Sequence, residues 1–306
     1  MDDSDRTASL MTPTKLSRAA PRPAASPAAW LDRMASDAGS LHVRRIGELR
    51  HDLLAQAMAR DAEPLSQQLV LLDEAMPKLD FSLLQPRGWL ARATGKGRSA
   101  GAEFAAQFEE IEQATRELAS RAQVLQKKQQ AGAAATDRAL MELGVEYGAV
   151  DKIIDQGAKW LQDMRTQLKA RNAEAVDAQA QQQVKEDAAR GEILVARLKL
   201  LRSASGAAQA THQAAQGVAA RRLALAQMLQ QALASDVKAW QVRLSALAAA
   251  GDSGGPALGV DGPIETHREL QLCVKRARAD CDQLLRQEAA MAQSLEALGQ
   301  QLQAAA

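Results

Sequence analysis

Residues 140–168 read LMELGVEYGAVDKIIDQGAKWLQDMRTQL, and the spacing of their apolar side chains decides the fold. Apolar or small residues recur there in steps that alternate between three and four, which places one continuous stripe along a helix. A seam of this kind packs against a partner helix, so we predict a long helix that is paired along its length. The seam residues are Leu140, Leu143, Tyr147, Val150, Ile154, Gly157, Leu161, Met164 and Leu168.

Helical spacing of apolar residues also occurs on both sides of this stretch. Residues 170–190 interrupt the stripe and are polar all round, so they form either a solvated helix or the turn between two long helices. We therefore predict a long-helix bundle core over residues 104–249. Its other seam residues are Phe104, Phe108, Ile111, Thr115, Leu118, Ala122 and Leu125 before the central stretch, and Ile193, Leu194, Leu198, Leu201, Val218, Leu225, Leu229, Leu233, Val237, Trp240, Leu244 and Leu247 after it.

The composition agrees with an almost wholly helical chain. Only 3% of the 306 residues are aromatic, whereas a β-sandwich or barrel would be rich in aromatic and β-branched residues. We predict an all-α fold of long antiparallel helices, packed as an elongated coiled-coil-like bundle with a disordered N-terminus. The formal net charge of +1 favours neither nucleic acid nor an anionic membrane as a partner.

The flanking segments predict the rest of the organisation. Residues 1–29 carry four prolines among Ser, Thr and Ala, which is typical of a disordered tail. We expect N-terminal helices over 30–76, a loop over 77–103, a flexible Gly- and Pro-rich linker over 250–263 and a C-terminal helix over 264–306.

The first residues do not resemble a secretory signal, and the apolar runs of the sequence are short. The chain opens MDDSDRTASLM, which is acidic where a secretory signal is basic. No apolar run reaches the ~20 residues that a membrane-spanning helix needs. The sequence therefore predicts a cytoplasmic protein without a transmembrane segment, and peripheral membrane association stays an open alternative.

One hexapeptide, Gly251–Pro256 (GDSGGP), resembles the nucleophile motif of chymotrypsin-like serine proteases. In that family the serine works with a histidine base and a buried aspartate on β-barrels. The four histidines here lie in helical or capping contexts, and strand-like alternation is lacking. A helix–helix linker uses the same residue types, so we interpret the motif as a linker.

The glycines around Lys96 suggest a phosphate loop but do not match one. A Walker loop has a glycine five residues before its Gly-Lys pair, and that position is Leu90 here. Short basic clusters also occur, each with acidic residues nearby, and we interpret them as solvated helical faces rather than a nucleic-acid site. These clusters are Arg44–Arg45, Lys127–Lys128, Arg221–Arg222 and Arg276 with Arg278.

The two cysteines are candidates for thiol or metal chemistry. Cys273 and Cys281 are eight residues apart, close to one helical face, and His267 precedes Cys273 by six residues. A metal site needs tighter spacing or ligands from another helix, and a free cysteine is commonly a small core residue. We expect packing roles, with a redox or thiol role left open. We assign no catalytic, cofactor-binding or metal-binding residue.

Three stretches of the chain, with a final segment, have a characteristic order and spacing. They are Gly88–Leu90, Gly95–Gly97, Phe104, Phe108, Ile111 and Leu118; then Val150–Ile154, Gly157 and Leu161; then Ala215–Leu229 and Lys238–Trp240, with Thr266–Leu285 at the end. Together they resemble the toxic anion (tellurite) resistance proteins of the TelA type, over roughly residues 80–300. This chain departs from the family in having less tyrosine and asparagine, and it offers no catalytic residue to transfer. The resemblance implies a cytoplasmic, helical bacterial protein linked to tolerance of tellurite or a related stress.

The sequence thus predicts a non-enzymatic helical scaffold or partner-binding protein associated with toxic-anion resistance or a stress response. We expect a protein partner, or self-association through the helical seams. The alternative is a direct oxyanion-binding or thiol-dependent detoxifying protein, supported by the basic clusters and the two cysteines.

Overall fold

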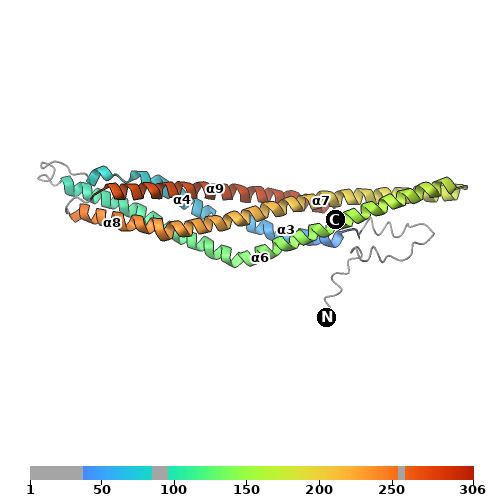
Figure 1. The fold of residues 1–306 in the computed structure, drawn as a ribbon, viewed down its shortest axis with the longest axis horizontal. Helices are drawn as coiled ribbons and strands as arrows, with labels where there is room; N and C mark the ends of the chain where they lie inside the picture. The colour runs from blue at the N-terminus through green and yellow to red at the C-terminus, as the bar shows by residue number, and fades with distance from the viewer. Residues whose placement is uncertain (1–36, 85–95, 254–258) are drawn as a thin grey trace, which may run out of the picture. The chain divides into compact units, whose positions relative to one another are not determined.

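The computed structural model describes residues 37–84, 96–253 and 259–306, and in these ranges all regular secondary structure is helical (Figure 1). The prediction of an all-α fold of long helices is confirmed for this part of the chain. The predicted disordered tail over 1–29 lies outside the described residues. The elements are α3 (Ser40–Met58), α4 (Glu63–Ala75), the 3-10 turns η2 (Met76–Lys78) and η3 (Phe81–Leu84), α6 (Lys96–Glu174), α7 (Ala178–Ala232), the π-helical turn η4 (Leu233–Val237), α8 (Lys238–Ser253) and α9 (Asp261–Ala304).

The chain divides into two compact units, each assembled from segments far apart in the sequence. Of the described residues, unit 1 contains 37–58, 135–216 and 290–306, and unit 2 contains 59–84, 96–134, 217–253 and 259–289. Helices α6, α7 and α9 each contribute to both units, because three of the boundaries fall inside these helices. The composition-based boundaries of the sequence analysis do not mark this division.

In unit 1, α3 packs with the C-terminal part of α6, the N-terminal part of α7 and the end of α9. The buried guanidinium of Arg197 on α7 donates hydrogen bonds to the carbonyl oxygens of Ala38, before α3, and Ala305, after α9. Burial lowers the pKa of Arg197. The apolar core comprises Val43, Ile46, Leu49, Leu53, Leu143, Val150, Ile153, Ile154, Leu194, Leu201, Ala204, Ala208, Leu295, Leu298 and Leu302.

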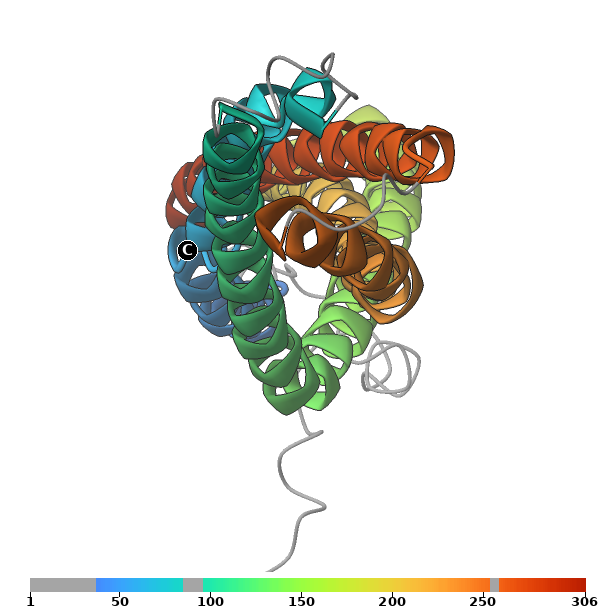
Figure 2. The ribbon, with the colours of Figure 1, turned by 90° about the vertical axis from the view of Figure 1, so that its left-hand side faces the viewer.

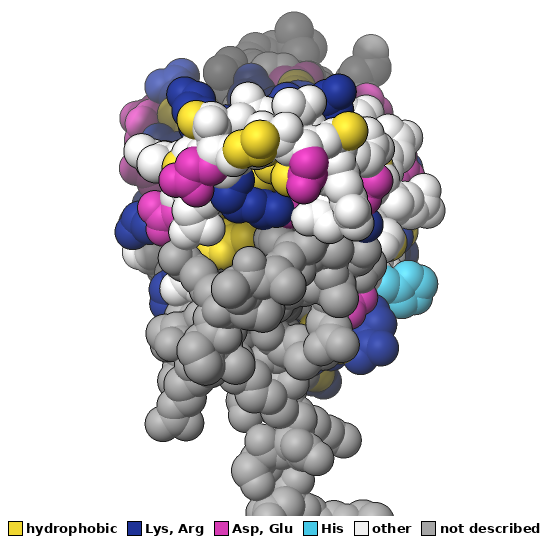
Figure 3. Space-filling model, turned by 90° about the vertical axis from the view of Figure 1, so that its right-hand side faces the viewer, with side chains coloured by type: hydrophobic (Ala, Val, Ile, Leu, Met, Phe, Trp, Pro, Cys, Tyr) yellow, Lys and Arg dark blue, Asp and Glu magenta, His cyan; other side chains and the backbone are white. Residues whose placement is uncertain are grey.

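Helices α6 and α7 form an antiparallel hairpin whose connection is residues 175–177. Residues 170–190 therefore contain the turn between two long helices, one of the two alternatives that the sequence allows. The Asp177 carboxylate accepts a hydrogen bond from the Ala180 amide at 2.6 Å, which satisfies a free donor at the start of α7. Figure 3 looks at the end of the structure where this turn lies, and the basic and acidic side chains visible there are interspersed.

The hairpin seam includes a buried carboxylate. Asp187 is 0% exposed, and it pairs with Arg171 across the seam at 2.9 Å and with Arg190 on its own helix at 3.5 Å. A polar residue in an otherwise apolar seam favours the one alignment in which its partners meet it. Gly157 and Leu198 pack against each other in the same seam.

In unit 2, α4 and the two 3-10 turns pack with α6, α8 and α9, the helices that gather at the end seen in Figure 2. All three phenylalanines of the chain lie here. Phe81 meets Phe104 with ring centroids 5.6 Å apart, and Phe108 meets Trp240 at 5.1 Å. The core also includes Leu65, Leu69, Leu72, Met76, Ile111, Leu118, Leu125, Leu225, Leu229, Val237, Leu244, Leu247, Leu270, Val274, Cys281 and Leu284.

The structure differs from the expected loop over 77–103 and linker over 250–263. Helix α6 begins at Lys96, and residues 76–78 and 81–84 form 3-10 turns. A glycine costs an anchored helix only about 1 kcal/mol, so Gly97 does not stop α6. At the linker, α8 continues to Ser253 and α9 begins at Asp261, since Pro263 is tolerated in the first turn of a helix.

Candidate functional site

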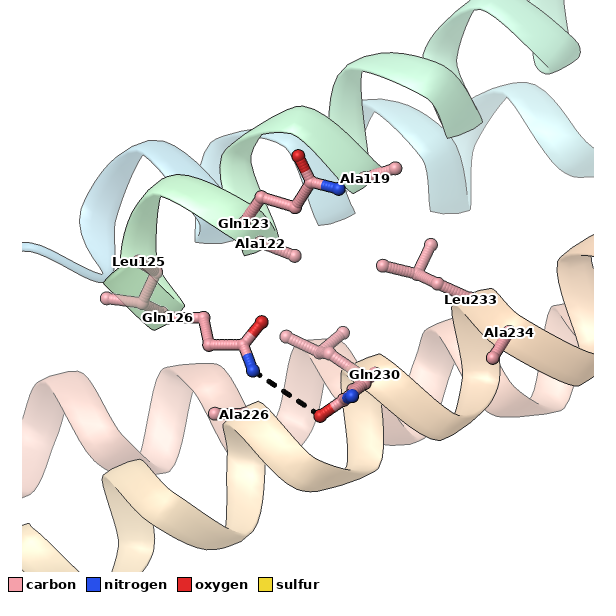
Figure 4. Close-up of a pocket in the computed structure, with 10 residues that line it drawn as sticks. Ala119, Ala122, Gln123, Leu125, Gln126, Ala226, Gln230, Leu233 and Ala234 are labelled. Carbon is pink, nitrogen blue, oxygen red and sulfur yellow. Dashed lines mark hydrogen bonds between the residues drawn. The ribbon is translucent and has the colours of Figure 1, made fainter. Parts of the chain in front are cut away.

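An open groove lies between α6 and α7 in unit 2, and its volume is about 390 Å³ (Figure 4). Four alanines and three leucines make its apolar walls, and three glutamines supply its polar groups. The amide of Gln126 on α6 donates a weak hydrogen bond to Gln230 on α7, 3.4 Å away. The lining residues are Ala119, Ala122, Gln123, Leu125, Gln126, Ala226, Leu229, Gln230, Leu233 and Ala234.

Small side chains contribute to the groove, since they occupy positions that leucine fills elsewhere. Ala122 belongs to the α6 seam, between the buried Leu118 and Leu125, and it is only half-buried. On α7, Ala226 lines the same groove. An alanine fills far less space than a leucine, so facing alanines leave a recess between two helices.

The π-helical turn η4 borders the groove directly, since its residue Leu233 and the neighbouring Ala234 both line it. In a π turn the backbone hydrogen bonds join residue i to residue i+5, and such turns are rare and often lie at functional sites. No pattern in the sequence predicts this site. The lining residues come from two segments far apart in the sequence, and each segment alone has the pattern of an ordinary amphipathic helix.

None of the ten lining residues is ionisable. The groove therefore presents apolar surface and neutral amides, which suit an apolar side chain of another helix or a neutral ligand. Charged ligands would find no counter-charge on these residues, and burying an uncompensated charge is costly.

His267, which the sequence analysis considered beside the cysteines, is buried in the core of unit 2. Its Nδ1 accepts a hydrogen bond from the Trp240 indole at 3.0 Å, and its Nε2 donates to the Met76 carbonyl at 2.9 Å. Burial lowers the pKa of His267, so its neutral form is favoured. Both ring nitrogens of His267 are engaged in these hydrogen bonds, so the imidazole has a packing role.

The two cysteines lie on α9 and are free. Burial raises the pKa of the Cys281 thiol to about 12, and burial also raises the pKa of Cys273, with Asp236 nearby as a second cause. Eight residues along a helix span about 12 Å, too far for a disulfide between them. Among the described residues, no group of three or more His, Cys, Asp or Glu is arranged to hold a metal ion.

Most of the basic clusters noted in the sequence meet carboxylates. Several of these contacts join different helices, so the charges help to fix helix pairing rather than forming one basic stripe. The pairs are Arg44 with Glu48 (4.0 Å), Arg45 with Glu142 (2.8 Å), Lys128 with Asp61 (2.7 Å), Arg221 with Asp280 (3.7 Å), Arg222 with Glu288 (2.7 Å) and Arg278 with Asp73 (2.8 Å).

The two loop motifs fall largely outside the described residues. Of the protease-like hexapeptide, residues 251–253 form the end of α8, and residues 254–256 are not described. Of the glycine-rich stretch, residues 94 and 95 are not described, and Lys96 begins α6. The histidines are on α3 (His42 and His51), α7 (His212) and α9 (His267).

Every helix in the described ranges is too short or too polar to cross a membrane. The residues that carry the family resemblance fall on α6, α7, α8 and α9, except for 88–90 and Gly95, which are not described. Comparison of the chain with protein-family models, with curated proteins and with solved structures found no match in any of the three.

Proposed function

We propose that this protein is a non-enzymatic helical scaffold that binds a partner protein through the groove between α6 and α7. The observation that carries the proposal is the groove lining, with seven apolar side chains and three amides between two antiparallel helices. An amphipathic helix of a partner can insert one apolar side chain between such helices, as knobs enter holes in coiled coils.

The biological setting of the proposal comes from the resemblance to the TelA-type proteins. We place the scaffold in the cytoplasm, in the response to tellurite or a related toxic anion or stress. Long paired helices support a scaffold role, because they hold a binding surface in a fixed geometry without needing a reaction centre. Self-association through the groove belongs to the same proposal, with a second copy as the partner.

The alternative is a protein that binds the oxyanion directly or reduces it through a thiol. The structure gives this alternative less support, because Arg221 and Arg222 are already paired with carboxylates. The raised pKa of Cys281 keeps its thiol protonated near neutral pH, and the thiolate is the reactive form.

A tolerance assay and a titration test the proposal together. Deletion of the gene should lower tellurite tolerance, and the wild-type chain should restore it. Calorimetric titration of the purified protein with tellurite should give no binding heat. Unchanged tolerance in the deletion strain would contradict the biological setting, whereas tellurite binding lost on Arg221→Ala or Cys273→Ser would favour the alternative.

A further inference from the structure

We propose that the π turn η4 is a conformational device that keeps the groove between α6 and α7 open. The inference concerns the geometry of the groove alone, so it does not depend on which molecule binds there.

The buried residues before and after η4 belong to two seams that are out of step by one residue. Before the turn, Leu225, Leu229 and Ala232 are buried, in steps of four and three. The same alternation would next bury Asp236 and Ala239, but both are exposed. The buried residues instead come one position later, in steps of three, four and three: Val237, Trp240, Leu244 and Leu247.

A π turn holds about one residue more than an α-helical turn, so it can absorb this phase difference. Both flanks are fixed by packing. Leu229 is buried before η4, and after it Trp240 is 0% exposed and hydrogen-bonded to His267. The additional residue must therefore be accommodated between them, in the turn itself.

The additional residue of the π turn lies beside the groove. Leu233 and Ala234 are the first two residues of η4, and both line the groove opposite Ala119 and Ala122 of α6. We infer that the wider turn displaces the α7 backbone from α6 at this point. Without the additional residue the seam would be continuous, and α7 would pack directly against α6.

Deletion of Ala234 in the full-length chain tests this inference. The deletion should restore an unbroken α-helical seam and close the groove, with the midpoint of thermal unfolding kept within about 3 °C of the parent. The reporter is Ala122→Cys, placed in the groove wall, and its alkylation rate is followed by site-resolved mass spectrometry so that Cys273 and Cys281 are counted separately. Deletion of Ala234 should slow alkylation of the introduced thiol at least tenfold.

Deletion of Gln213, an exposed residue of α7 in unit 1, is the matched control. It removes one residue where the helix has no π turn to absorb the change, so it should lower the unfolding midpoint by more than about 10 °C. An unchanged alkylation rate after deletion of Ala234 would overturn the inference. So would a loss of stability as large as that caused by deletion of Gln213, or failure of the Ala234 deletion to fold.

Discussion

The indole Nε1 of Trp240 donates a hydrogen bond to Nδ1 of His267 at 3.0 Å, and Nε2 of His267 donates in turn to the carbonyl oxygen of Met76 at 2.9 Å. This chain of bonds fixes the tautomer of the imidazole, because only Nε2 can carry the proton. It also joins α8, α9 and the 3-10 turn η2 in the core of unit 2.

Trp240→Phe should destabilise the protein by about 1–3 kcal/mol, because Nδ1 of the buried His267 loses its donor and apolar contact area is lost with it. Urea-induced unfolding followed by circular dichroism measures the change. Trp160→Phe is the comparison, since Trp160 is only half-buried. A loss for Trp240→Phe no larger than that for Trp160→Phe would contradict the role of Trp240 in the core of unit 2.

Stability should fall as the pH is lowered below about 6.5, the ordinary pKa of histidine in an unfolded chain. Burial lowers the pKa of His267 in the folded protein, so the unfolded chain takes up a proton that the folded chain does not. The contribution is therefore complete above that pH and is lost towards the lower folded-state pKa. His267→Gln keeps a donor and an acceptor without titrating in this range.

The free energy of unfolding of wild type and His267→Gln, measured in urea on both sides of pH 6.5, checks this prediction. Wild type should lose more stability on acidification than His267→Gln does. The same pH dependence in both proteins would assign it to other groups.

Gly157→Ala and Gly148→Ala, both on α6 in unit 1, should change stability in opposite directions. A Cβ at Gly157 would lie 2.8 Å from Cδ1 of the buried Leu198, so overpacking should cost roughly 1–3 kcal/mol. Nothing lies within 4 Å of a Cβ at Gly148, so alanine should add up to about 1 kcal/mol through its higher helix propensity. Thermal unfolding measures both variants, and a gain at Gly157 would contradict the close packing of α6 on α7.

Cys281 should react with an alkylating reagent far more slowly in the folded protein than in urea. Its pKa of about 12 leaves almost no thiolate at pH 8, and the side chain is buried. Mass spectrometry of the labelled peptides distinguishes it from Cys273. Reaction of Cys281 at the rate of the unfolded chain would instead support the thiol-dependent alternative.

The long helices could be predicted from the sequence because their seams are local and periodic. The alternating steps from Leu140 to Leu168 correspond to buried or half-buried positions along α6. The start of the same helix was missed, because Gly95 and Gly97 suggest a loop while the packing that supports the first turns comes from other segments.

The groove and the π turn could not be predicted in the same way. The spacing of Leu229, Leu233, Val237 and Trp240 fits a continuous α-helix, so the change of phase is visible only once burial distinguishes Ala232 from Leu233. The groove needs small residues on α6 and α7 to face each other, which depends on the register of a hairpin. The division into two units is hidden for a related reason, since three of its four boundaries lie within unbroken helices.

Complementation of the gene deletion by a variant with a filled groove tests the central claim most directly. Ala122→Phe fills the groove, and Ala131→Phe places the same side chain at an exposed position of α6 outside it. Both variants should fold with wild-type helicity; Ala131→Phe should restore tellurite tolerance, and Ala122→Phe should leave the strain as sensitive as the deletion. Full tolerance with a folded Ala122→Phe protein would contradict a partner-binding role for the groove.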